Sequence, residues 1–185
     1  MSKYGLLDPG TCIPVLEVAF AVYQINSVLE FGCGIWSTGC FVRNSKQTTS
    51  IENVEEWVKF VKQEYSHKNN LDVVHYTKPM NEYFNETKEN YDLIFIDGND
   101  RKECLQAAFY RSPIIVCHDM HTNEFKWQSV KVPSDYNLML YTGCEPYITG
   151  IFGHKDILLK ENILNRKNYK HRNTYIDESF WVMGN

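Results

Sequence analysis

The sequence lacks a long apolar run, a signal-peptide pattern and an excess of positive charge. No stretch of its 185 residues has the ~18 consecutive apolar residues that cross a bilayer, so we expect no membrane contact. The opening MSKYGLLDPG has no basic, apolar and small-residue zones of a signal peptide, which favours a cytoplasmic protein. A formal net charge of −4 gives no electrostatic reason to expect nucleic acid as the main partner. The basic run at residues 165–172 is interpreted as a solvated face, with phosphate or RNA contact as the less favoured alternative.

Paired cysteines and repeats are also missing. The 6 cysteines include no CxxC pair, which argues against a zinc ribbon. Most of them lie in apolar runs, where a reduced thiol packs as a small hydrophobic group, as in a reducing cytoplasm. No repeat, low-complexity tract or linker divides the chain. With 43% hydrophobic and 23% charged residues, we expect one globular domain over residues 1–185.

The sequence does contain an alternation of short β runs and helical stretches. We expect strands at residues 27–31, 48–51, 71–76, 91–96, 113–117, 136–141 and 148–154. Helices are expected at residues 13–24, 36–43, 54–61 and 101–110, with shorter helical turns at 81–88 and 123–130. Asp100 and Glu103 form a capping-box pattern at the start of the helix 101–110. Strands followed by helices favour an α/β fold with a parallel sheet covered on both faces.

Two glycines follow the first expected strand, in the stretch SVLEFGCGIWSTG. Gly32 and Gly34 lack a Cβ, so the backbone there can turn sharply and approach a ligand closely. A dinucleotide-binding G-x-G-x-x-G motif would need a third glycine where Ser37 stands. The strand also carries Glu30 near its end, and a carboxylate repels a diphosphate but suits a cationic amine. The stretch therefore favours a ligand with an amino acid part.

Glu52 ends the second expected strand, about twenty residues beyond Gly32, where an acid can accept hydrogen bonds from both ribose hydroxyls. A ribose together with an ammonium group describes S-adenosylmethionine. The alternative is that Glu52 only caps the next helix, since acids are favourable at a helix start.

Four motifs in order carry a resemblance to a known family: VLEFGCG followed by S-T, then TSIE, YDLIFIDG and PIIVCHD. From residue 27 to about 154 the chain resembles the class I S-adenosylmethionine-dependent methyltransferases. The resemblance implies a three-layer α/β sandwich: a mostly parallel seven-stranded sheet with a C-terminal antiparallel hairpin, the Rossmann-like methyltransferase fold. It also implies a set of cofactor contacts. Glu30, Gly32 and Gly34 would line the methionine part, with Cys33 between the two glycines. Glu52 would hold the ribose, Ile51 and Asn53 would lie near the adenine, and Asp97 would lie near the methyl group.

The nearest relatives by resemblance are small-molecule O-methyltransferases in which acids after the fourth and fifth strands bind a metal. Asp97 and Asp119 would then supply oxygen ligands for Mg²⁺ or another divalent cation, which would lower the pKa of a hydroxyl acceptor. His118 would be a third ligand or the general base, and Mn²⁺ or Zn²⁺ would tolerate its imidazole better. The alternatives are a simple turn at Asp97, a helix cap at Asp119 and a packed histidine at 118.

The sequence therefore predicts a methyltransferase that moves a methyl group in line from S-adenosylmethionine to a hydroxyl acceptor, most simply a small molecule. A nucleic-acid 2′-hydroxyl stays open as the acceptor. Residues 1–12, the turn 142–147, the C-terminal tail or a second copy in a homodimer could complete the acceptor pocket. Another enzyme using the same cofactor and a non-catalytic cofactor-binding module are the alternative functions.

Overall fold

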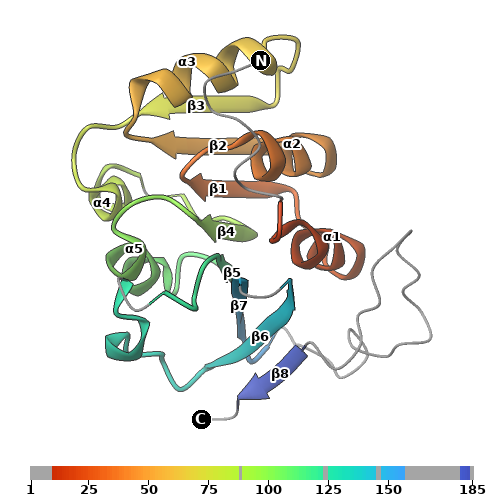
Figure 1. Ribbon diagram of the computed structural model, residues 1–185, viewed down its shortest axis with the longest axis vertical. Helices are drawn as coiled ribbons and strands as arrows, with labels where there is room; N and C mark the ends of the chain where they lie inside the picture. The colour runs from red at the N-terminus through yellow and green to blue at the C-terminus, as the bar shows by residue number, and fades with distance from the viewer. Residues whose placement is uncertain (1–9, 88, 123–124, 145–146, 157–179, 184–185) are drawn as a thin grey trace.

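The computed structural model describes residues 10–87, 89–122, 125–144, 147–156 and 180–183, which form one sheet with helices on its two faces (Figure 1). The strand order is β3-β2-β1-β4-β5-β7-β6-β8. The first five of these strands are parallel, and β7, β6 and β8 continue the sheet in antiparallel pairs. The strands are β1 Ser27–Phe31, β2 Gln47–Glu52, β3 Leu71–His75, β4 Leu93–Ile96, β5 Ile114–Cys117, β6 Tyr136–Cys144, β7 Tyr147–His154 and β8 Phe180–Met183.

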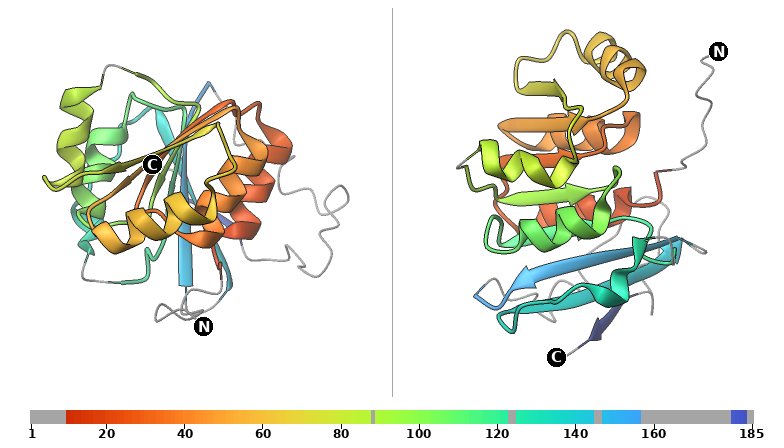
Figure 2. Two further views of the ribbon diagram at one scale, coloured as in Figure 1. Left: turned by 90° about the horizontal axis from the view of Figure 1, so that it is seen from above. Right: turned by 90° about the vertical axis from the view of Figure 1, so that its left-hand side faces the viewer.

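Successive side chains of each buried strand point to opposite faces, and this alternation divides the core in two. Val28 and Phe95 pack with helices α1 and α2, whereas Leu29 and Ile94 pack with α4 and α5 on the other face. Figure 2 shows the two helical layers on either side of the sheet. The helices are α1 Ile13–Val22, α2 Ile35–Asn44, α3 Glu55–Glu64, α4 Tyr83–Glu86 and α5 Arg101–Ala108, with 3-10 turns η1 Met80–Glu82 and η3 Trp127–Ser129.

The predicted α/β fold class, with a parallel sheet and a C-terminal antiparallel hairpin, is confirmed. The prediction of seven strands is one short, because β8 pairs with β6 and adds an eighth. Only four residues form β8, and such a short apolar run in the tail carries no period that distinguishes a strand. The helix expected at 123–130 is reduced to η3 among the residues described there. The basic run 165–172 and the other tail residues before β8 lie outside the described residues, as do residues 1–9.

The predicted capping box at the start of α5 is wrong. Asp100 has a left-handed backbone (φ 55°) and its side chain makes no capping hydrogen bond. Instead its Oδ2 accepts a hydrogen bond from the backbone N–H of Met80 at 3.3 Å. The left-handed turn points the carboxylate away from the helix and toward η1.

None of the helices in the described parts of the chain combines the length and apolar character needed to cross a membrane.

Candidate functional site

The loops that follow β1, β2, β4 and β5 meet at one edge of the sheet because these neighbouring strands are parallel (Figure 1). Backbone hydrogen bonds join the loops directly. Gly32 N–H donates to the carbonyl of Ile51 at 2.8 Å, and Asp97 N–H donates to the carbonyl of Phe31 at 2.8 Å. All the site residues predicted from the sequence therefore lie on or beside this edge.

Gly32 and Gly34 differ in why each is glycine. Gly32 has φ +89°, and a Cβ there would lie 2.5 Å from the backbone of Gly98, in the loop after β4. The protein's own chain thus requires glycine at position 32. Gly34 is the N-cap of α2, and its ideal Cβ meets nothing closer than Ser37 Oγ at 3.6 Å, an ordinary contact. Among the described residues no packing contact requires glycine at 34, although glycine also suits an N-cap, and its predicted contact with the cofactor stays a prediction.

Alanine substitutions separate these two reasons. Gly32→Ala is expected to destabilise the fold by several kcal/mol, because a backbone clash adds to the strain of a positive φ. Gly34→Ala is expected to unfold at nearly the wild-type denaturant concentration and to bind S-adenosylhomocysteine more weakly. Urea unfolding and calorimetric titration check the pair. Unchanged affinity in a folded Gly34→Ala protein would show that no ligand lies against this glycine.

Glu30 is 0% exposed and is held by three hydroxyl groups. Its carboxylate accepts hydrogen bonds from Ser37 Oγ at 2.6 Å, Thr38 Oγ1 at 2.7 Å and Ser50 Oγ at 2.5 Å. Thr38 Oγ1 in turn accepts from the backbone N–H of Gly34 at 3.0 Å. The carboxylate therefore ties β1, β2 and the first turn of α2 together and fixes the shape of the glycine loop.

The sequence predicted a direct cofactor contact for Glu30, and that contact stays a prediction. Because Glu30 is 0% exposed, a ligand atom would reach its carboxylate only after the surrounding groups moved. The three hydroxyl residues were missed as site residues, although Ser37 and Thr38 lie in the first turn of α2, directly after the glycine loop.

The buried carboxyl of Glu30 makes stability depend on pH. Desolvation raises its pKa from 4.5 to about 7, against the opposing effect of the three hydroxyls. Between these values the unfolded chain has lost the proton that the folded protein keeps. The stabilisation is therefore complete below the unfolded pKa and is lost as pH rises through the folded pKa, a change of about 3 kcal/mol.

Urea unfolding of the wild type and of Glu30→Gln between pH 4 and pH 8 measures this effect. The free energy of unfolding of the wild type should fall relative to that of the variant as pH rises. A constant difference between the two proteins would show that Glu30 titrates normally.

Glu52 is buried at the end of β2 and binds the backbone of its own loops. Oε1 accepts from the N–H groups of Asn53 and Val54, both at 2.8 Å, and Oε2 accepts from Cys33 N–H at 3.2 Å. Burial raises the pKa of Glu52, whereas these backbone hydrogen bonds lower it. The helix-cap alternative has support here, since Val54 is the N-cap of α3. A carboxylate has about four lone-pair sites, so the three bonds leave acceptor capacity for a ribose.

The two residues predicted beside adenine lie in different surroundings. Ile51 is fully buried in the sheet, whereas Asn53 is half-buried, with its Oδ1 3.3 Å from Nδ2 of Asn99. Among the described residues the exposed large apolar side chains include Val54 and Ile35, which directly follow the two predicted cofactor loops. These two offer apolar surface that the sequence reasoning did not select.

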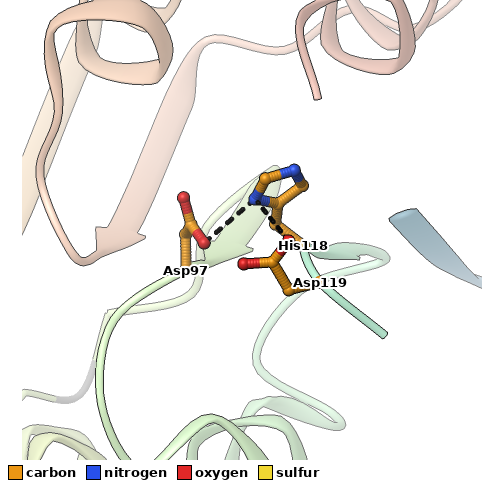
Figure 3. Close-up of side chains that lie close together, drawn as sticks. All are labelled: Asp97, His118 and Asp119. Atoms are coloured by element: carbon orange, nitrogen blue, oxygen red, sulfur yellow. Dashed lines mark hydrogen bonds and ion pairs between the residues drawn. The ribbon is translucent and has the colours of Figure 1, made fainter. Parts of the chain in front are cut away.

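Asp97, His118 and Asp119 form a compact cluster after β4 and β5 (Figure 3). His118 is 2% exposed, and its Nδ1 lies 3.1 Å from Oδ1 of Asp97 and 3.6 Å from Oδ1 of Asp119. The Tyr147 ring stacks on the imidazole with centroids 6.2 Å apart. Because Nδ1 faces a carboxylate, we assign the proton to Nδ1 and a lone pair to Nε2.

Arg101, which the sequence reasoning missed, joins the two acids. Its Nε donates to the Gly98 carbonyl, and one terminal nitrogen donates to the His118 carbonyl and to Asp119 Oδ2. The other terminal nitrogen donates to the Asp97 carbonyl and forms an ion pair with Asp97 Oδ1. The two ion pairs measure 3.0 Å to Asp97 and 2.9 Å to Asp119. Its position four residues after Asp97 on α5 is the sequence signal that would have found it.

The arrangement of strands and helices has counterparts among solved structures. An rRNA methylase of Streptococcus thermophilus superimposes with a TM-score of 0.61 at 13% identity, covering 76% of this chain and 94% of that chain. The N-methyltransferase NodS of Bradyrhizobium japonicum, in complex with S-adenosyl-L-homocysteine, gives a TM-score of 0.61 at 11% identity, covering 79% of this chain and 85% of that chain. This chain has the Rossmann-like methyltransferase fold.

The methyltransferase fold is also that of a spermidine synthase of Thermotoga maritima, which has a TM-score of 0.55 at 17% identity over 80% of this chain and 60% of that chain. No protein-family model matches the sequence, and no curated protein matches it. At these identities the likeness establishes the fold alone, so the reaction has to be argued from the site.

Two features of the cluster of Asp97, His118 and Asp119 favour a bound divalent cation, and one opposes it. The three donor groups lie within 4.8 Å of one another, and Oδ1 of Asp119 is buried without a hydrogen-bond partner among the described residues. Arg101, however, already pairs both carboxylates with a full positive charge. A second cation about 4 Å from the guanidinium would face a repulsion of several kcal/mol. The charge balance of the cluster therefore does not fit a resident metal.

Proposed function

We propose that the protein is an S-adenosylmethionine-dependent methyltransferase that acts on a hydroxyl group. One juxtaposition carries the proposal. The open glycine at the start of α2 and the Glu52 carboxylate lie at the same sheet edge as His118, whose Nε2 carries the lone pair that a base needs. The fold supports the choice of cofactor, because a solved protein of this fold is complexed with S-adenosyl-L-homocysteine.

In this proposal the cofactor lies across the loops after β1 and β2. Glu52 accepts hydrogen bonds from the ribose, and exposed Val54 packs against the adenine beside Asn53. Gly34 lets the methionine part approach the backbone at the start of α2. Glu30 holds this loop in shape through Thr38 and is a positioning residue.

The residues after β4 and β5 have different roles in the proposed reaction. S-adenosylmethionine supplies a methyl group already activated by its positive sulfur, so the protein has to align the acceptor oxygen and exclude water. His118 Nε2 takes the hydroxyl proton as the oxygen attacks, and Asp97 orients the imidazole through Nδ1. Arg101 fixes both carboxylates and the two loops that carry them. Asp119 adds negative charge near the imidazolium that forms.

We propose further that this reaction needs no divalent metal, because Arg101 supplies the positive charge at the cluster. Methyl transfer should therefore be unchanged by excess EDTA and not stimulated by added Mg²⁺ or Mn²⁺. Initial rates with labelled cofactor, measured before and after chelation, check this. A loss of activity with EDTA that Mn²⁺ restores would return Asp97 and Asp119 to the role of metal ligands predicted from the sequence.

Transfer of label from methyl-labelled S-adenosylmethionine to a panel of sugars, phenols and nucleosides tests the proposed function. Label on an acceptor oxygen is the expected result. A second candidate is a different reaction on the same cofactor, since a spermidine synthase has the same fold. Consumption of the cofactor with the label retained on a thioether product would favour it. Binding without turnover across the panel would favour a non-catalytic module.

A further inference from the structure

Thr11 makes a contact that the proposed function does not use. It lies just before α1, within residues 1–12, which are one of the alternatives named from the sequence for completing the acceptor pocket, and its hydroxyl lies 2.7 Å from Nε2 of His118. Both side chains are buried, at 7% and 2% exposure. The pair joins positions 107 residues apart in the chain. The contact is therefore a tertiary one, made at the imidazole atom that would receive the acceptor's proton.

The hydrogen bonds run in one direction, from hydroxyl to imidazole to carboxylate. Because Nδ1 donates to Asp97 Oδ1, the Nε2 lone pair accepts the Thr11 hydroxyl proton. This order, a hydroxyl on a base that a carboxylate orients, is the one a general base adopts toward its substrate. A ring nitrogen has one lone pair, so Thr11 and an acceptor hydroxyl cannot both bind it.

We propose that the Thr11 hydroxyl occupies the subsite of the acceptor hydroxyl, and that an acceptor alcohol binds by displacing it. This inference rests on the proposed function and names its substrate class. The subsite holds a neutral hydroxyl donor in a buried place, where a charged amine would lose its hydration without an opposite charge at Nε2. The acceptor group is therefore an alcohol.

The displacement needs only a local change. Rotation about the Cα–Cβ bond of Thr11 carries the hydroxyl away from Nε2 without moving the backbone. The neighbours on either side are anchored: Cys12 is 1% exposed in the core, and the backbone at Gly10 turns at φ +66° beside Trp36. Thr11 thus acts as a side-chain gate on a fixed backbone.

Reaction of His118 with diethyl pyrocarbonate, followed by peptide mass spectrometry, tests the gate without requiring an acceptor. The wild type, Thr11→Ala, Thr11→Ser and the exposed control Thr77→Ala are compared. Thr11→Ala should be modified at His118 about fivefold faster than the wild type, since no hydrogen bond has to break first. Thr11→Ser and Thr77→Ala should react at the wild-type rate. Equal rates in the wild type and Thr11→Ala would overturn the proposal.

A second experiment repeats the modification of His118 in the presence of methanol, which serves as a probe alcohol. Methanol should slow modification of His118 in Thr11→Ala, by filling the vacated subsite, and leave the rate in Thr11→Ser unchanged. Failure of methanol to protect His118 in Thr11→Ala would exclude an alcohol subsite there. Calorimetric titration of the wild type with S-adenosylhomocysteine runs in parallel. Absence of binding would refute the proposed function, whereas the histidine measurements decide the Thr11 subsite independently.

Discussion

His118→Gln is expected to lower kcat for methyl transfer by about 10²–10⁴-fold while leaving cofactor binding intact. The glutamine amide cannot take a proton from the acceptor, whereas the residues proposed to hold the cofactor, Gly34 and Glu52, lie at the loops after β1 and β2. Single-turnover transfer of labelled methyl and calorimetry with S-adenosylhomocysteine measure the two effects separately. His67→Gln, on an exposed turn, is the matched control and should keep the wild-type rate.

Asp97→Asn tests the orienting role in the same pathway. The amide can no longer act as a carboxylate partner for Nδ1–H of His118, so kcat should fall although the base itself is present. Retention of the wild-type rate within about threefold in His118→Gln would place the base elsewhere or show that the acceptor needs none.

Arg101→Met is expected to destabilise the fold by about 3–5 kcal/mol, because two mostly buried carboxylates would lose their shared positive partner. The side chain of Arg101 is 11% exposed, and those of Asp97 and Asp119 are 18% and 21% exposed. Four hydrogen bonds that hold the loops after β4 and β5 together would be lost as well. Urea unfolding at neutral pH measures the change in the free energy of unfolding.

Lys59→Met provides the control for Arg101→Met. It removes the i,i+4 ion pair with Glu55, in which the Lys59 and Glu55 side chains are 71% and 56% exposed, and should change the free energy of unfolding far less than Arg101→Met does. If both substitutions lowered the free energy of unfolding by the same amount, the ion pairs of Arg101 would stabilise the fold no more than an exposed ion pair does. The proposed role of Arg101 as the resident cation of the cluster would then lose its support.

The fold was predictable because its central strands are short, mostly apolar runs followed by glycines or acids. The runs at 27–31 and 113–117 lie within one residue of β1 and β5, since both strands are buried on two faces. The capping box failed because sequence spacing does not reveal the left-handed backbone of Asp100. The strand β8 was missed because four apolar residues become a strand only through pairing with β6.

The places of Asp97 and Asp119 in the fold were predictable from the sequence, whereas their interaction partners were less so. Asp97 and Asp119 follow from the rule that ligands bind beyond the carboxyl ends of parallel strands. Arg101 was missed although its spacing from Asp97 placed it within reach, because a cation was sought among metals. Thr11 could not have been found, since its contact with His118 depends on how α1 packs against the sheet.

A crystal structure with S-adenosylhomocysteine tests the central claim most directly. The account predicts a ribose hydroxyl within hydrogen-bond distance of Glu52, with the homocysteine part against Gly34 and the sulfur facing the side of His118 and Asp97. A nucleoside bound elsewhere, or a Glu52 carboxylate still bonded only to the N–H groups of Cys33, Asn53 and Val54, would contradict it.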